Sequence, residues 1–191
     1  MFDATLRLPF GPAGIRLEQI DVARDALREV EFFFRLRRTE DLYSKLHDVF
    51  SRWGGIYART AETHWARRAR GALDADGFMH GYIDLVARVG DAYFIADWKT
   101  NRVMEKGAKF MTRRNLEDEI VESGYALQWA IYAIALRRLL RETRGGNGGA
   151  RLAGVAYFFV RWNAVHFDDS LDDARLDELE AALALEGGVK A

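Results

Sequence analysis

Two short apolar runs lie close together near the middle of the chain, and each carries one aspartate. They are Gly81-Tyr82-Ile83-Asp84-Leu85-Val86 and Tyr93-Phe94-Ile95-Ala96-Asp97-Trp98-Lys99. Runs of this length, rich in aromatic and β-branched residues, are typical of buried strands. The Val89-Gly90-Asp91-Ala92 segment between them is typical of a tight turn. The pattern therefore predicts a β-hairpin.

The predicted turn decides which hairpin residues face each other. With Gly90 and Asp91 as the turn residues, Asp84 lies directly opposite Asp97. Side chains opposed in this way are roughly 5 Å apart, and like charges there are destabilising. Lys99 follows Asp97 by two residues, so it lies on the same face of the sheet. We therefore expect a cation between the carboxylates, in a compact hydrolytic metal site of two acids and a lysine.

The segment from Arg28 to Leu36 alternates in the manner of another strand. Val30, Phe32 and Phe34 share one face, and Glu31 lies on the other. Alternation alone favours a solvated strand face for Glu31, because half-exposed strands normally show this pattern. An acid on a strand with such strong core character also remains a candidate for the site.

The remaining periodicity predicts four helices and one more strand, and one of the helices is a short one from about residue 117 to Gly124. Thr39 is a candidate N-cap for a helix over residues 40–53, which Gly54 and Gly55 would end. The other predictions are a helix over 125–142, a strand over 154–162 and an acidic amphipathic helix over 171–185. This order indicates an α/β fold with a mixed central sheet flanked by helices. We expect one domain over residues 1–191, with its core over about 28–162.

Side chains on the predicted 125–142 helix add to the candidate site. Tyr125, Gln128 and Tyr132 share one face of that helix. Their polar tips need partners, which a DNA backbone, the metal site or neighbouring main chain could supply.

Two basic segments flank the hairpin in sequence. Over residues 56–77, Tyr57 and Trp65 alternate with Arg59, Arg67, Arg68 and Arg70. Such a stretch can hold phosphate and stack on bases, or it can be an ordinary solvated segment. Residues 102–116 are predicted to be a basic loop that contacts substrate.

Composition narrows the chemistry. The chain has no cysteine, which excludes thiolate zinc sites, iron–sulfur clusters and a cysteine nucleophile. Any metal must be held by oxygen or imidazole, and oxygen ligands suit Mg²⁺, with Mn²⁺ or Ca²⁺ as substitutes. The net charge of −1 neither supports nor excludes a nucleic-acid partner. No apolar run is long enough to span a membrane, and no signal peptide is evident, so we expect a cytoplasmic location.

The motifs together resemble those of a known family. The Gly81–Val86 run, the Asp97-Trp98-Lys99-Thr100-Asn101 run, and Tyr125 with the Gln128–Tyr132 segment resemble the PD-(D/E)XK nucleases. Within that group they are similar to the carboxy-terminal nuclease domain of RecB subunits, which belong to the helicase–nuclease RecBCD (exodeoxyribonuclease V). The resemblance runs from about Glu29 to the Tyr157–Trp162 strand and implies a restriction-endonuclease-like core.

The resemblance implies a role for each matching residue. Asp84, Asp97 and the carbonyl of Trp98 would bind Mg²⁺, and Lys99 would be the catalytic lysine. Glu31 would help to bind the water shell of the metal. Gln128 and Tyr132 match a Gln-x-x-x-Tyr motif near the site and DNA, with Tyr125 beside them. The implied partners are DNA and the helicase and RecC-type subunits of such a complex.

The sequence departs from the family pattern upstream of the first core strand. The family has a metal-binding histidine on a helix there, whereas no histidine precedes Glu29 here. The later histidines, His47, His64, His80 and His166, do not match that motif. We therefore expect that the upstream helical part of the family domain is missing, or that the ligand is replaced. The Gly-x-x-x-x-Gly-Lys phosphate loop of the helicase motors is also absent.

Three functions compete on this basis. The first is a Mg²⁺-dependent nuclease domain that cuts single-stranded DNA during double-strand-break processing. The second is a nuclease-like module that binds DNA or partner subunits without cutting, which the missing histidine favours. The third is a structural domain with a buried ion pair between Lys99 and one aspartate, which would leave the other acid unpaired at a free-energy cost.

Overall fold

A single mixed sheet organises the chain in the computed structural model, which describes residues 2–66, 75–101, 112–144 and 150–190. The strand order is β5-β4-β3-β2-β1-β6. β3 and β4 run parallel, and the other neighbouring strands are antiparallel. The strands are β1 (Ala26–Thr39), β2 (Ala75–Val89), β3 (Ala92–Lys99), β4 (Arg151–Phe159), β5 (Ala164–Asp168) and β6 (Leu185–Lys190).

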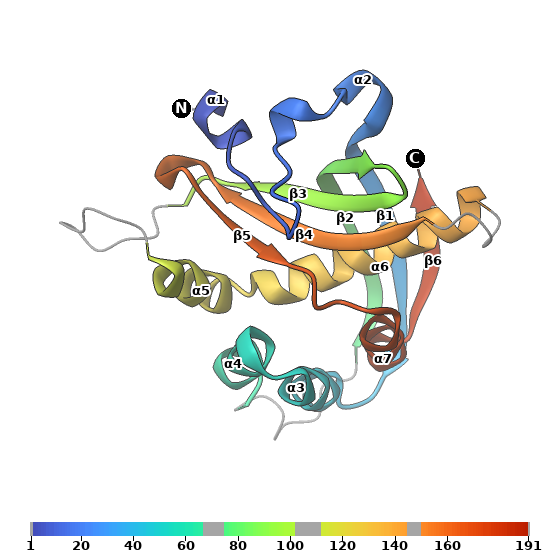
Figure 1. The fold of residues 1–191 in the computed structure, drawn as a ribbon. Helices are drawn as coiled ribbons and strands as arrows, with labels where there is room; N and C mark the ends of the chain where they lie inside the picture. The colour runs from blue at the N-terminus through green and yellow to red at the C-terminus, as the bar shows by residue number, and fades with distance from the viewer. Residues whose placement is uncertain (1, 67–74, 102–111, 145–149, 191) are drawn as a thin grey trace.

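Helices cover both faces of the sheet, as Figure 1 shows. The larger layer comprises α3 (Leu42–Trp53), α4 (Gly55–His64), α5 (Arg113–Glu122), α6 (Tyr125–Arg144) and α7 (Asp173–Leu183). The smaller N-terminal layer comprises α1 (Phe2–Leu6), the 3₁₀ turn η1 (Leu17–Gln19) and α2 (Val22–Asp25). A second 3₁₀ turn, η3, spans Val160–Trp162. The mixed sheet with flanking helices confirms the predicted restriction-endonuclease-like α/β fold.

Two hydrophobic clusters, one on each face, hold the layers together. The larger contains Phe34, Ile95 and Trp129, all fully buried between the sheet and the large helical layer. The smaller contains Phe94 and Phe158 under the N-terminal layer, where Phe10 packs edge-on against both rings at 5.7 and 5.6 Å. The two apolar faces explain why β3 and β4 read as nearly continuous apolar runs.

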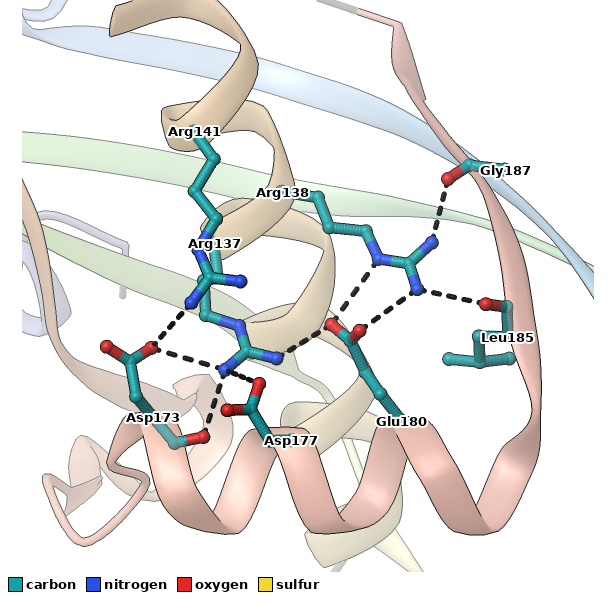
Figure 2. A network of polar contacts seen from close by, with 8 residues as sticks. All are labelled: Arg137, Arg138, Arg141, Asp173, Asp177, Glu180, Leu185 and Gly187. Carbon is teal, nitrogen blue, oxygen red and sulfur yellow. Dashed lines mark hydrogen bonds and ion pairs between the residues drawn. The ribbon is translucent and has the colours of Figure 1, made fainter. Parts of the chain in front are cut away.

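An ion-pair network fixes α7 and β6 to α6 (Figure 2). The Arg137 guanidinium, buried against α7, contacts the carboxylates of Asp173, Asp177 and Glu180 at 3.2, 2.8 and 2.8 Å. Arg138 also pairs with Glu180, and it donates to the carbonyls of Leu185 and Gly187. These two arginines therefore hold the C-terminal helix and strand in place through acceptor groups of five residues on one side of the sheet.

Several predicted element boundaries were wrong. Thr39 is the last residue of β1 rather than an N-cap, because pairing with β2 continues to Thr39↔Ala75, and α3 begins at Leu42. The predicted 154–162 strand ends at Phe159, and η3 begins at Val160. The predicted 171–185 helix is shorter, since the Asp172 side chain accepts from the Arg175 amide at its start and Leu185 already belongs to β6.

The segment before the long helix was predicted to be a loop over residues 102–116 and a short helix from about 117, and the short helix begins earlier than predicted. α5 begins at Arg113, because the Thr112 hydroxyl accepts from the Asn115 amide and the Asn115 side chain accepts from the Thr112 amide. The basic positions Arg102, Lys106 and Lys109 lie outside the described residues, as do the predicted connector at 145–149 and Arg67, Arg68 and Arg70. The predicted substrate contact of residues 102–116 and the hypothesis that the three arginines hold phosphate stay predictions.

Candidate nuclease site

The predicted hairpin is present with the predicted register. Val89 pairs with Ala92 across the Gly90-Asp91 turn, and the ladder of paired residues runs to Leu85↔Ala96. Asp84 and Asp97 are the next positions along the two strands. Beyond Leu85, β2 pairs with β1 and β3 pairs with β4. The two aspartates therefore lie where the hairpin strands part.

A kink in β1 sets the position of Asp84. The β1–β2 register pairs Arg28 with Leu85 and Val30 with Ile83 but omits Glu29 and Asp84 between them. Glu29 has a φ of 50°, a left-handed conformation that costs a non-glycine residue about 1–2 kcal/mol. Across this kink Ile83 joins the core under the large helical layer, whereas Leu85 joins the core under the N-terminal layer. Asp84 thus sits where the strand changes the face that it buries.

Trp98 holds the Asp84 carboxylate through its main chain. Its backbone N–H donates to Asp84 Oδ2 at 3.0 Å. The Trp98 indole packs on the other face of the sheet, 5.0 Å from the Phe158 ring. A hydrogen bond between neighbouring strands thereby replaces the main-chain ladder where the hairpin opens.

Asp97 is the most deeply buried acid of the site. It is 3% exposed, and burial raises its pKa from 3.8 to about 6, with Lys99 opposing and Asp84 adding to the rise. The Lys99 ammonium lies 2.6 Å from Asp97 Oδ1. Among the described residues no aligned hydrogen bond reaches that oxygen. A buried carboxylate with so few donors, and with a second carboxylate in electrostatic range, has unused capacity to bind a cation.

Lys99 is enclosed by residues of β4 and α6. Its ammonium donates to Gln128 Oε1 at 2.8 Å and lies 4.1 and 4.6 Å from the ring centres of Tyr125 and Tyr157. Those two rings stack on each other at 5.5 Å. Two aromatic faces, an amide oxygen and the Asp97 carboxylate therefore fix the position of this 8% exposed lysine.

Gln128 joins the helix to both strands. Its Oε1 also accepts from the Tyr157 hydroxyl at 2.9 Å, and its Nε2 donates to the Tyr132 hydroxyl at 2.9 Å. Burial and the two aspartates raise the pKa of Tyr132, so its hydroxyl stays protonated. The polar face of α6 thus contacts side chains of the site, and the alternative that neighbouring main chain satisfies all three residues is wrong.

Glu31 occupies a different place from the other predicted site residues. It pairs with Tyr82 on the exposed face of β1 and β2, where its carboxylate contacts His80 Nε2 at 2.8 Å and accepts from the Tyr82 hydroxyl at 3.2 Å. The described residues contain no cluster of three or more histidine or acidic side chains arranged to bind a metal ion. Asp84 and Asp97 are therefore the acids that the structure brings together, and the role of Glu31 at the metal remains a prediction.

The structure also adds residues that sequence reasoning missed. Tyr157 contacts Lys99 and Gln128 because β4 pairs in parallel with β3 and sets Tyr157 beside Asp97. No local pattern gives that register. Asn101 Nδ2 donates to the Tyr125 hydroxyl at 2.6 Å and to Glu119 Oε1 at 2.8 Å. Asn101 follows Lys99 in the recognised motif, which was the available signal.

The first position of the Gly-Tyr-Ile-Asp motif, Gly81, has no room for a side chain. A Cβ at this position would lie 2.7 Å from the Phe32 ring. That ring packs edge-on against Tyr132 at 5.7 Å. The missing side chain lets β1 carry a phenylalanine directly beneath the Tyr132 end of the site.

The aromatic residues of the 56–66 segment have a structural role. Tyr57 and Trp65 are buried in the core around Phe50. The Arg59 guanidinium forms an ion pair with Asp118 of α5. The hypothesis that Tyr57 and Trp65 stack on bases is therefore wrong, because both rings are buried in the core.

The comparison with known proteins agrees with this geometry. Residues 14–187 match the PD-(D/E)XK nuclease superfamily. The chain belongs to that superfamily. It is also 35% identical over 167 residues to the RecBCD enzyme subunit RecB of Mycobacterium tuberculosis, a match that covers 80% of this chain and 15% of the relative. The RecB subunit of Escherichia coli is 27% identical over 160 residues, which cover 83% of this chain and 13% of the relative.

These matches confirm the predicted resemblance to PD-(D/E)XK nucleases and RecB subunits. They also show that the chain spans only a small part of the RecB proteins that it matches. Among the described residues, no helix is both long and apolar enough to cross a membrane.

Proposed function

We propose that this chain is a Mg²⁺-dependent nuclease that hydrolyses phosphodiester bonds of DNA. The observation that carries the proposal is the convergence of Asp84, Asp97 and Lys99 where the hairpin opens, with the lysine 2.6 Å from the buried Asp97 carboxylate. Membership of a nuclease superfamily supports the same chemistry.

The residues fit a divalent metal. Asp84 and Asp97 supply carboxylate oxygens, which Mg²⁺ prefers, and the Trp98 carbonyl would add a third oxygen. Mn²⁺ or Ca²⁺ would occupy the same ligands. A cation bound there would polarise a phosphoryl oxygen and lower the pKa of a bound water.

The other side chains of the site hold the Lys99 ammonium and the Gln128 amide in position. Gln128, Tyr125 and Tyr157 hold the Lys99 ammonium on the carboxylate face, where it can donate to a phosphate oxygen or to the attacking water. Tyr132 keeps its proton and fixes the Gln128 amide. These contacts are made before substrate arrives, so little reorganisation is needed.

The substrate and the partner subunits are the more specific part of the proposed function. The relatives are named as RecB subunits of RecBCD enzymes, which supports a domain that works beside other subunits of such a complex. We further propose, from the family resemblance, that the domain cuts single-stranded DNA during double-strand-break processing, beside helicase and RecC-type subunits. Glu31 would then assist the water shell of the metal.

A binding module that does not cut is the second candidate. It is favoured by the absence, among the described residues, of a third metal-binding side chain beside Asp84 and Asp97. The purely structural alternative receives partial support, since the Lys99–Asp97 ion pair does form. The Asp84 carboxylate also accepts a hydrogen bond from the Trp98 amide, which lowers the free-energy cost that counts against that alternative.

A cleavage assay separates these candidates. Labelled single-stranded DNA is incubated with Mg²⁺ and the wild type, Asp97→Ala or Lys99→Ala, with Asp91→Ala in the hairpin turn as the control. The nuclease proposal expects cutting by the wild type and the control, and loss in both site variants with circular dichroism unchanged. DNA binding by the wild type without cutting would establish the binding module instead.

A further inference from the structure

The carboxylate of Glu119 joins α5 to the end of β3. Its Oε1 accepts from Asn101 Nδ2 at 2.8 Å and from the Ser123 hydroxyl at 2.7 Å. Ser123 lies one helical turn after Glu119, so its hydrogen bond fixes the Glu119 side chain along the helix. Glu119 belongs to none of the motifs that resemble the nuclease family. Its contact with Asn101 therefore brings an element outside those motifs to the candidate site.

The chemistry of Glu119 sets the direction of the Asn101 amide. An ionised carboxylate can only accept hydrogen bonds, so the part of the amide that faces it must be the NH₂ group. The same nitrogen also donates to the Tyr125 hydroxyl oxygen at 2.6 Å. Both hydrogens of the Asn101 amide are therefore used, and they connect Glu119 to Tyr125.

Tyr125 benefits from an anchor outside its own helix. It is the first residue of α6 and follows Gly124, whose φ of 69° is left-handed and marks the turn from α5 to α6. Helix ends fray, so the first residue is held less firmly than the interior. Asn101 fixes the hydroxyl end of the ring, and the ring stacks on Tyr157 at 5.5 Å with 11° between the two planes. These two contacts together set the position of the ring.

The anchored ring lies against the candidate catalytic lysine. The Lys99 ammonium is 4.1 Å from the centre of the Tyr125 ring, which is closer than the 4.6 Å to the Tyr157 ring. An ammonium over an aromatic face is attracted by the ring, more strongly where water is excluded, and Lys99 is only 8% exposed. A displaced Tyr125 ring would thus release the ammonium from one of its contacts.

We propose that Glu119 is a positioning residue of the nuclease, which acts through Asn101 and Tyr125 to hold the Lys99 ammonium in place for a phosphate oxygen. This inference rests on the proposed nuclease function. The acceptor oxygen of Glu119 matters rather than its charge, because two neutral side chains lie between Glu119 and the lysine.

Two variants at position 119 separate the contact from the charge. Glu119→Gln still offers an oxygen to both donors, whereas Glu119→Ala offers none. Glu117→Ala is the matched control, since Glu117 lies on the same helix and its carboxylate pairs with Arg113 and Arg59. Circular dichroism should be unchanged in all three variants.

The first measurement follows Lys99 without metal or substrate. Each protein is treated briefly with acetic anhydride in EDTA, and mass spectrometry gives the acetylation rate of Lys99 relative to exposed Lys45 of α3. We expect Glu119→Ala to acetylate Lys99 roughly fivefold faster than the wild type, the ratio that the loss of one hydrogen bond gives. Glu119→Gln and Glu117→Ala should match the wild type.

The second measurement is the steady-state cleavage of single-stranded DNA with Mg²⁺. The kcat of Glu119→Ala should be about tenfold lower with KM nearly unchanged, because the lysine acts once substrate is bound. Glu119→Gln and Glu117→Ala should keep the wild-type kcat.

Three results would overturn the role of Glu119. One is equal acetylation of Lys99 in all four proteins. Another is a Glu119→Gln variant that behaves like Glu119→Ala, which would show that the charge matters rather than the contact. The third is a higher KM for Glu119→Ala with unchanged kcat, which would assign Glu119 to DNA binding. A wild type that does not cut DNA would contradict the nuclease function instead, since the acetylation rates do not depend on cutting.

Discussion

At the scale of the residue, Asp97 is an acid whose charged form is disfavoured by burial. Asp97 has a folded pKa of about 6 against an ordinary value of 3.8. The folded state therefore binds the proton more tightly, and the stability gained from protonation is lost as pH rises through about 6. A shift of about two units corresponds to about 3 kcal/mol at most. Without metal, the charge of Asp97 destabilises the protein at neutral pH.

Asp97→Asn should thus be more stable than wild type in EDTA at pH 8. The uncharged amide avoids the burial cost, although the weakened Lys99 contact limits the gain to about 1–2 kcal/mol. Thermal melts at pH 8 and pH 4.5 measure the difference, which should shrink at the lower pH, where wild-type Asp97 is already protonated. Asp91→Asn in the turn is the control. A lower melting temperature for Asp97→Asn at pH 8 would show that the ion pair outweighs the burial cost.

Tyr157 should act as a positioning residue for Lys99. Tyr157→Phe keeps the ring near the ammonium but removes the hydroxyl that donates to Gln128. We expect kcat to fall about tenfold with KM nearly unchanged, the usual size of such supporting effects. Steady-state kinetics with Mg²⁺ measure this. Tyr57→Phe, a buried tyrosine that contacts Trp129 outside the site, is the matched control and should leave kcat unchanged. A kcat for Tyr157→Phe equal to that of the wild type would show that the Tyr157 hydroxyl does not help to position Lys99.

At the scale of the element, α6 serves two ends of the molecule. Its first turns carry Tyr125, Gln128 and Tyr132 to the site, and its later turns carry Arg137 and Arg138 to α7 and β6 (Figure 2). The Nε atom of Arg137 is buried and has no hydrogen-bond partner in the part of the chain that the structure describes. The network is therefore a strong but incompletely satisfied attachment for the C-terminal elements.

Arg137→Met should destabilise the protein substantially. The change leaves the Glu180 carboxylate, one-fifth exposed, with fewer cations, and breaking a buried pair costs about 3–5 kcal/mol. Urea unfolding measures the loss. Arg113→Met, which breaks an exposed pair with Glu117 within one helix, should cost less than about 0.5 kcal/mol. Similar midpoints for the two variants would show that the network contributes little.

At the scale of the whole molecule, the sequence predicted what depends on local pattern. The hairpin register, the long helix and the pairing of Lys99 with an aspartate follow from alternation, a two-residue turn and helical spacing. β5 and β6 were not predicted, because short strands of mixed polarity become strands only through their neighbours. The kink at Glu29 was missed for a related reason, since nothing in the sequence signals a left-handed glutamate.

Glu31 has contacts that the motif does not give. Its carboxylate lies against His80 and Tyr82, and the role that the resemblance implies for it at the metal stays a prediction. Tyr157 lies outside the recognised motifs and yet contacts Lys99 through a parallel strand pair. Long-range sheet register thus separates the predicted part of the site from the rest.

The proposed nuclease requires Asp84 and Asp97 to bind a divalent metal, without which no cleavage occurs. The most direct measurement is the rate of single-stranded DNA cleavage as Mg²⁺ is titrated into EDTA-treated wild type and Asp84→Asn. We predict saturable activation of the wild type, and a rate for Asp84→Asn reduced about 100-fold or more at every Mg²⁺ concentration. Cleavage by the wild type in EDTA, or equal Mg²⁺ activation of the two proteins, would contradict the metal site.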